Sequence, residues 1–422
     1  MNAFYKSFLI PVIVVMGTAF QGCVKDTCKR ELPATIYTAV RKSLTDVRAD
    51  VRMVAATEVH HPGKIYIKGS YIFLNELNKG IHVFDNRNPA APKQISFINI
   101  PGNVDLAVSG NALYADSFMD LVVFDITDPV NVKLNKRVEN VYDVRYNYQF
   151  TQVRDSLIVD YLARDTVYQL DCSSIPTGGP VMYSDANSVT LQNASAKSNY
   201  SAVAKGGSMS RFTVMNSTLY LIDNAEIKAY NIQQPDNPQF ANTTKVAFGI
   251  ETLFPYKNYL FVGANAGMYI MDASNPTAPV LKGTFSHVRS CDPVVVEDDK
   301  AYVTLRSGSA CQGFTNQLEV VDVKNVEAPF LIKTYPMKNP WGLGIDNGKL
   351  FICEGKFGLK FLDASNTTDI KTVKLLEGIE TYDVIPYNDV LLVSAKDGLY
   401  QYSYTDLQKP KLLSKIPVTD VK

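Results

Sequence analysis

The chain has 422 residues, of which 46% are hydrophobic and 11% aromatic, so it is long and apolar enough to fold around a large core. Lys and Arg number 42, and Asp and Glu also number 42, which gives a formal net charge of zero. Because no overall field attracts a polyanion, we do not expect a nucleic-acid partner.

The first 22 residues have the pattern of a targeting segment. Lys6 gives a positive start, an apolar stretch runs from Phe8 to Phe20, and a small residue, Gly22, precedes Cys23. The stretch is short for a transmembrane helix and contains Pro11, so it predicts a secretory signal peptide over residues 1–22. The alternative is an ordinary signal peptide that is cut elsewhere, with Cys23 incidental.

This segment resembles a bacterial lipoprotein signal, in which a small residue precedes the Cys that receives the lipid. The resemblance implies that Cys23 is lipidated, that the partner at this end is a membrane, and that the protein is an outer membrane lipoprotein on the periplasmic or surface-exposed face. Residues 24–26 (Val-Lys-Asp) look like a surface-export signal. Residues 23–52 are polar and predict a tether that contains a short helix.

A short apolar strand that ends in Asp recurs through the rest of the chain, mostly at intervals of about 40 residues. Eight copies are visible, six that end in Asp, one in Asn231 and one in Ser403, with apolar runs at 81–85, 121–125, 167–171, 227–231, 268–272, 318–322, 359–363 and 399–403. Prolines often follow four and seven residues after the Asp, as Pro276 and Pro279 follow Asp272. We expect the repeated Asp residues to be structural, because an Asx side chain bonds the backbone of a turn and Pro ends a strand.

Each unit has room for four short antiparallel strands, and one such unit cannot bury both of its faces. The pattern therefore predicts an all-β fold over residues 53–422, a single β-propeller of four-stranded antiparallel blades. We expect eight blades; seven would follow if one degenerate unit, of which residues 142–207 depart most, is not a full blade. Residues 53–59 read as an extra strand that helps to close the ring.

The run Leu121-Val122-Val123-Phe124-Asp125 and its relatives resemble the LVIVD repeat, which is named for that apolar run and its Asp. The resemblance covers about residues 53–420 and implies a β-propeller in an exported protein. It implies nothing specific about a ligand or an activity.

Six cysteines are present, and five remain if Cys23 carries lipid. Cys291 and Cys311 are the candidate disulfide, since both fall in connections on the same side of the ring; the alternative is two unpaired thiols. Cys353 lies in a predicted strand, where we expect a small buried residue.

No motif for a catalytic nucleophile, a phosphate-binding loop or a metal site occurs in the sequence, so we predict no catalytic residues, no cofactor and no metal. His60 and His61 could ligate a metal, but a pair without a spaced third ligand is typical of a solvated loop.

Function on a ring scaffold gathers where loops of several blades converge. Loops between blades and loops that join second to third strands share one end of the ring. They supply a candidate ligand-binding face of His287, Arg289, Arg306, Trp341, Glu354 and Lys356. The alternative is that Trp341 fills the channel wall and the charges are solvated.

The sequence thus favours a binding or scaffolding protein at the cell envelope, with an envelope protein or a glycan as partner, over an enzyme. The alternatives are a hydrolase or lyase that acts on an extracellular polymer or glycan, and a glycan-binding module. Fold alone does not choose between them.

Overall fold

The structure is a computed structural model that describes residues 29–142, 156–171, 180–185, 188–193, 210–286, 293–307 and 315–419. The chain divides into two compact units, Met1–Tyr37 with Ala163–Ala194, and Thr38–Leu162 with Ser195–Lys422. Among the described residues, no helix is long and apolar enough to cross a membrane.

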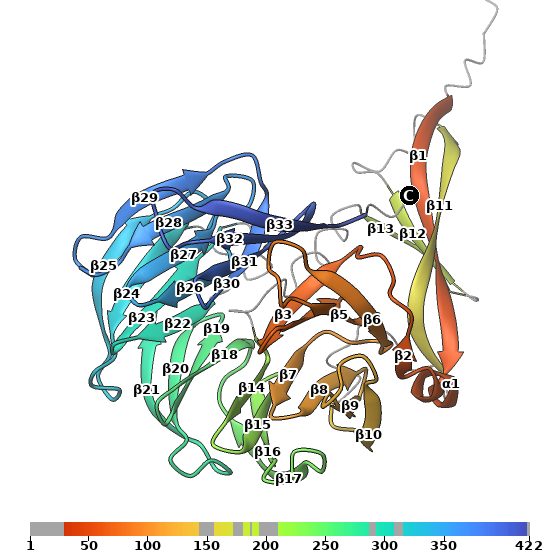
Figure 1. The fold of residues 1–422 in the computed structure, drawn as a ribbon. Coiled ribbons are helices and arrows are strands. Elements are labelled where there is room, and N and C mark those ends of the chain that lie inside the picture. Colours follow the sequence, from red (N-terminus) through yellow and green to blue (C-terminus); the bar gives the residue numbers. More distant parts are fainter. Residues whose placement is uncertain are drawn as a thin grey trace, which may run out of the picture. The chain divides into compact units, whose positions relative to one another are not determined.

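The larger unit contains seven antiparallel sheets, which Figure 1 shows as successive blades from orange to blue. Blade 1 consists of β3 (Pro62–Lys68), β4 (Tyr71–Glu76), β5 (Gly80–Asp85) and β6 (Lys93–Asn99), and blade 2 of β7 (Leu106–Ser109), β8 (Ala112–Ser117), β9 (Asp120–Asp125) and β10 (Lys133–Val138). Blade 3 consists of β14 (Phe212–Met215), β15 (Thr218–Asp223), β16 (Glu226–Asn231) and β17 (Gln239–Lys245). Blade 4 consists of β18 (Ile250–Tyr256), β19 (Tyr259–Ala264), β20 (Gly267–Asp272) and β21 (Val280–Ser286). Blade 5 consists of β22 (Val294–Glu297), β23 (Lys300–Leu305), β24 (Gln317–Asp322) and β25 (Phe330–Pro336). Blade 6 consists of β26 (Leu343–Asp346), β27 (Lys349–Cys353), β28 (Leu359–Asp363) and β29 (Lys371–Leu376). Blade 7 consists of β30 (Thr381–Tyr387), β31 (Val390–Ala395), β32 (Gly398–Ser403) and β33 (Lys411–Pro417).

The predicted propeller is confirmed, with the smaller of the two blade counts, and the preferred count of eight is wrong. The third repeat copy is not in a blade: residues 167–171 belong to β11 (Ser156–Asp171), in a separate sheet. That sheet has the order β11-β1-β12-β13, with β1 (Lys29–Ser43), β12 (Pro180–Asp185) and β13 (Ser188–Asn193). An apolar run that ends in Asp therefore predicts a strand but not the partner with which it pairs.

The segment predicted as a tether contains regular structure. Residues 29–43 form β1, and α1 (Leu44–Ala49) follows, with the Ser43 hydroxyl accepting a hydrogen bond from the N–H of Asp46 as an N-cap. Arg48 donates from Nε and Nη2 to the two carboxylate oxygens of Asp120 at 2.9 and 3.1 Å, so α1 is clamped onto blade 2. Val47, only 1% exposed, packs into the same place.

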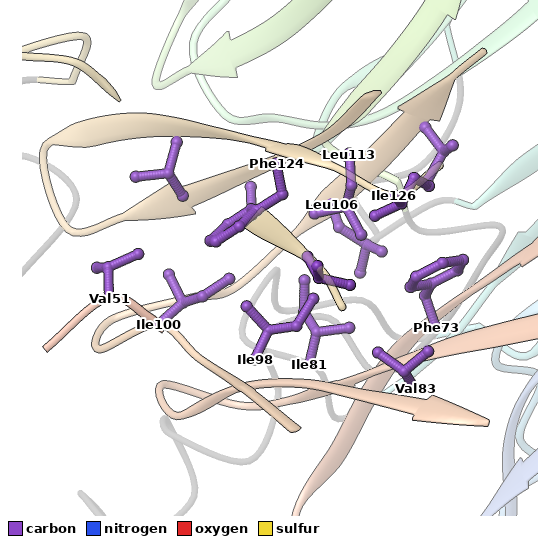
Figure 2. Close-up of a cluster of buried hydrophobic side chains, with 14 residues drawn as sticks. Val51, Phe73, Ile81, Val83, Ile98, Ile100, Leu106, Leu113, Phe124 and Ile126 are labelled. Carbon is purple, nitrogen blue, oxygen red and sulfur yellow. The ribbon is translucent and has the colours of Figure 1, made fainter. Parts of the chain in front are cut away.

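The core of the ring consists of apolar clusters between neighbouring blades. Figure 2 shows one of them, in which Phe73 and Ile81 of blade 1 face Leu113 and Phe124 of blade 2. Similar clusters fill each of the other six junctions, including the junction between blades 7 and 1. Because every blade has one apolar face toward each neighbour, no blade is stable alone and the blades stack into a ring.

The repeated Asp residues are turn caps, as predicted. The carboxylates of Asp125, Asp272 and Asp363 accept the backbone N–H two residues later at 2.8, 2.8 and 3.0 Å. In Asp272, the hydrogen bonds from Ser274 lower the pKa of the carboxyl. A β-bulge follows at the same place in the fourth strand of every blade, counted from the axis. The turn is therefore a structural element of the repeat and not a row of catalytic acids.

The ring closes between blades 7 and 1. Residues 52–54 form β2 (Arg52–Val54), which pairs with the outer edge of β6 and so extends blade 1. Of the segment 53–59, which the sequence predicts to help close the ring, only the end does so: the carbonyl of Val59 accepts the N–H of Thr419 at 2.8 Å. Closure also uses Asn86 and Gln401, which exchange two side-chain hydrogen bonds of 3.0 and 2.8 Å.

Candidate functional site

One end of the ring, here called the loop end, is where second strands finish and innermost strands begin. Arg306 directly follows β23, and Trp341 lies in the connection from blade 5 to blade 6. The guanidinium carbon of Arg306 lies 3.4 Å from the centroid of the Trp341 ring. The two connections therefore meet at the loop end. We call this contact the Arg306–Trp341 stack.

The backbone fixes Trp341 in place. Its N–H donates to the carbonyl of Cys353 at 2.7 Å, and its carbonyl accepts from the hydroxyl of Thr304 at 2.8 Å. Tyr382 of blade 7 contacts the indole edge-to-face, with ring centroids 5.2 Å apart. Gly355 has a φ of +55°, and a Cβ there would lie only 2.8 Å from the indole nitrogen. Glycine is thus required under the indole, both for its backbone and for space.

Arg306 is a poorly hydrated cation, since only 9% of the residue is exposed. Burial lowers the pKa of its guanidinium to about 10, although the charge of Glu251 acts in the opposite direction. A guanidinium held against an indole face is stabilised by the ring quadrupole. Because it covers one face of Trp341, that face is not an open platform on which a sugar could stack.

Glu354 and Lys356 flank Gly355, and their side chains have partners outside the stack. Glu354 is fully buried, and one of its oxygens lies 3.1 Å from Nζ of Lys360 and 2.8 Å from the N–H of Lys338. Lys356 is exposed, and its ammonium lies 5.3 Å from the ring centroid of Phe357. Glu354 is thus an internal counterion, which makes it poorly placed as a general acid toward a polymer in solvent.

Several predicted residues lie outside the described residues: Cys23, His287, Arg289, Cys291 and Cys311. Cys353 is described and is fully buried in β27, as expected from its strand position. Burial raises the pKa of its thiol, which makes the thiol unreactive.

His60 and His61 contact Glu76 through their backbone N–H groups. Their N–H groups donate to the carboxylate of Glu76 at 3.0 and 2.5 Å, and His82 contacts the same carboxylate at 3.0 Å. Burial alone would raise the pKa of Glu76, but these hydrogen bonds outweigh it and lower the pKa. Within the described residues, no group of three His, Cys, Asp or Glu side chains is placed to hold a metal ion.

The loop end also contains a buried polar cluster that the sequence pattern did not predict. Nζ of Lys64 lies 2.7 Å from a carboxylate oxygen of Asp105, and both residues are under 5% exposed. Lys64 also donates to the carbonyl of Leu106 at 2.8 Å and to the hydroxyl of Ser210. The other oxygen of Asp105 accepts the N–H of Phe212 at 3.2 Å. This Lys64–Asp105 bridge therefore links blades 1, 2 and 3.

A sequence signal for the bridge exists. Lys64, Asp105, Arg211 and Asp383 occupy one position of the repeat, because each directly precedes the innermost-strand residue that pairs with the fourth residue of the second strand. A polar residue at that position is a candidate for the loop end of the channel.

Asp116 extends the cluster. One of its oxygens accepts hydrogen bonds from Nδ2 of Asn103 at 2.7 Å and from the N–H groups of Val104 and Asp105 at 2.7 and 3.0 Å. Burial raises the pKa of Asp116 to about 6, and the charge of Asp105 adds to the rise, whereas the hydrogen bonds and the charge of Arg211 oppose it. The carboxyl therefore titrates above the usual range of an aspartate.

Comparison with known proteins agrees with this architecture. The LVIVD repeat family matches residues 102–140, which include blade 2, and residues 256–287, which include most of blade 4. No curated protein matches the chain. Among solved structures, the computationally designed protein Ika8 is similar with a TM-score of 0.53 at 9% identity, over 86% of this chain and 88% of Ika8. A protein from Lactobacillus plantarum is similar with a TM-score of 0.51 at 11% identity, over 76% of this chain and 86% of that protein. These likenesses concern the fold alone. The chain is a β-propeller, two segments of which match the LVIVD repeat.

Proposed function

We propose that the protein is an exported, lipid-anchored binding or scaffolding protein of the cell envelope, with lipid on Cys23 and the loop end of the ring as its recognition face. The observation that carries the proposal is the Arg306–Trp341 stack with Tyr382, which brings side chains of three blades to one place. Arg, Trp and Tyr are the residues in which binding energy is most often concentrated.

Two further features support binding over catalysis. Glu354, the acid predicted for this face, is buried against Lys360. The burial of Arg306 lowers the effective dielectric constant around its charge, so a carboxylate or carbonyl oxygen of a partner at the loop end would be attracted strongly. We therefore expect a protein partner that is recognised through such an oxygen.

Lipidation is tested by expressing the full chain in a Gram-negative host fed with an alkyne fatty acid. We expect labelling of the protein and its recovery in the membrane fraction, and loss of both in Cys23→Ser. An unlabelled wild-type protein would overturn the anchor.

Partner binding is tested by quantitative capture from cell envelope with the full chain, Arg306→Gln and Trp341→Leu. We expect the two variants to lose the same captured proteins by about tenfold, which corresponds to 1.4 kcal/mol of binding free energy. Lys133→Gln is the control, since this exposed lysine opens β10 at the end of the ring opposite to the loop end. Identical capture by all four proteins would overturn the assignment of the recognition face, and saturable binding to a glycan array alone would favour the glycan-binding alternative.

A further inference from the structure

The axis of the ring contains a cavity of about 420 Å³. Its wall comes from the innermost strands of six blades, β3, β14, β18, β22, β26 and β30, together with Ser210 just before β14. Most of the side chains that line it are apolar, and they include Ile67, Val214, Phe254, Val295, Ile345 and Ile385.

Several of these side chains keep exposed apolar surface although they lie at the centre of the ring. Ile67, Phe254, Ile345 and Ile385 are only partly buried, whereas the apolar residues between blades, such as Phe73 and Phe124, are nearly completely covered. Apolar side chains in a close-packed interior normally contact neighbours on every side. The cavity therefore leaves surface that another apolar group can cover with a gain in free energy.

The charged groups of the described wall residues do not favour an ionic ligand. Among the described residues that line the cavity, Lys64 is the only one with a charged side chain, and it is paired with Asp105 at 2.7 Å. Its ammonium group also donates to the carbonyls of Leu106 and Phe212 and to Ser210, so its three protons are already used. A charged ligand would lose its hydration without a partner in the wall, which is costly.

We propose that the axial cavity is a binding site for a small, uncharged, apolar molecule, aromatic or aliphatic. The volume lies in the range of small-molecule sites, and apolar cavities as small as roughly 150 Å³ are known to bind benzene or xenon. This site is separate from the Arg306–Trp341 stack, whose two residues are not in the cavity wall. The inference therefore goes beyond the proposed partner binding and does not depend on it.

The first test uses the uncharged fluorophore 1-aminoanthracene with the full chain. We expect saturable fluorescence enhancement, and at least tenfold weaker binding in Val214→Trp and in Ile345→Trp, because each added indole occupies cavity space. Val130→Trp is the matched control, because Val130 is 59% exposed on blade 2 and does not line the cavity. The absence of saturable binding, or equal affinity in the filled variants and the control, would overturn the proposal.

The second test needs no variant, which keeps the proposal falsifiable if a filled variant fails to fold. Crystals of the unmodified protein are pressurised with xenon, and we expect xenon density between Phe254, Ile345 and Ile385. A continuous chain of ordered water in the cavity with no xenon would overturn the proposal, because it would mean that the cavity is hydrated and not apolar in behaviour.

Discussion

Two junctions of the ring lack a short covalent connection, and they are closed by different chemistry. Between blades 2 and 3, the chain leaves the ring after β10 and returns at β14, more than 70 residues later. There the buried carboxylate of Asp105, which is also paired with Lys64 of blade 1, accepts the N–H groups of Arg211 and Phe212 and places a charge at the junction. Between blades 7 and 1, where the chain begins and ends its circuit, neutral groups close the ring: the Asn86–Gln401 pair and the backbone bond from Thr419 to Val59.

The comparison teaches that apolar packing between blades does not need charge. Both junctions have an apolar cluster of the same kind. The polar groups at the edges of the two clusters differ, so the stability of the two junctions depends on different interactions. Removal of one partner of a buried ion pair leaves an uncompensated charge, whereas removal of one partner of an amide pair leaves only an unpaired neutral group.

The largest expected effect is at the charged junction. Asp105→Ala would leave the ammonium of Lys64 buried without its counterion and would remove the acceptor for the N–H of Arg211 and Phe212. We expect a loss of about 3–5 kcal/mol in the free energy of unfolding, measured by denaturant unfolding.

A double-mutant cycle with Lys64→Met is the control. Because Lys64→Met/Asp105→Ala leaves no unpaired buried charge, we expect it to be less destabilised than the sum of the single variants. Simple additivity would contradict a direct ion pair and would break the distinction between the two junctions.

The second effect concerns pH. The pKa of Asp116 is raised in the folded state, to about 6 from 3.8, so the folded protein binds more protons than the unfolded chain between these values. Stability from this group is therefore fully present below pH 4 and falls as pH rises to about 6, by at most about 3 kcal/mol.

Asp116→Asn tests this contribution to stability, because asparagine has the shape of aspartate but does not titrate. We expect the difference in unfolding free energy between wild type and Asp116→Asn to change between pH 4 and 7, in favour of the wild type at the acidic end. A constant difference across that range would show that Asp116 titrates normally.

The smallest effect is at the neutral junction. Gln401 is fully buried and donates to Asn86 at 2.8 Å and to the hydroxyl of Ser414 at 3.2 Å. Gln401→Ala should lower the unfolding free energy by about 2 kcal/mol, through a lost hydrogen-bond pair and a small cavity. The loss of unfolding free energy should be the same at pH 4 and pH 7, in contrast to the effect of Asp116→Asn. A pH-dependent loss would merge the two junctions into one class.

Local chemistry was predictable because it repeats. Asp125, Asp272 and Asp363 each bond the turn two residues later, and Cys353 is buried as its strand position indicated. The meeting of Arg306 and Trp341 followed from the order of strands in a blade, which places their two connections at the same end. The blade count did not follow in the same way, since residues 167–171 have the repeat pattern but pair outside the ring.

The sequence by itself determined the strand period, the turns and the all-β class, because these depend on residues close together in the chain. Only the tertiary structure decided that there are seven blades, that β2 extends blade 1, and that Lys64 finds its counterion in the next blade. The physical reason is that ring closure and buried charge depend on which surfaces meet across long sequence separations. An apolar strand fits several neighbours equally well, and the complete set of blades selects one of them.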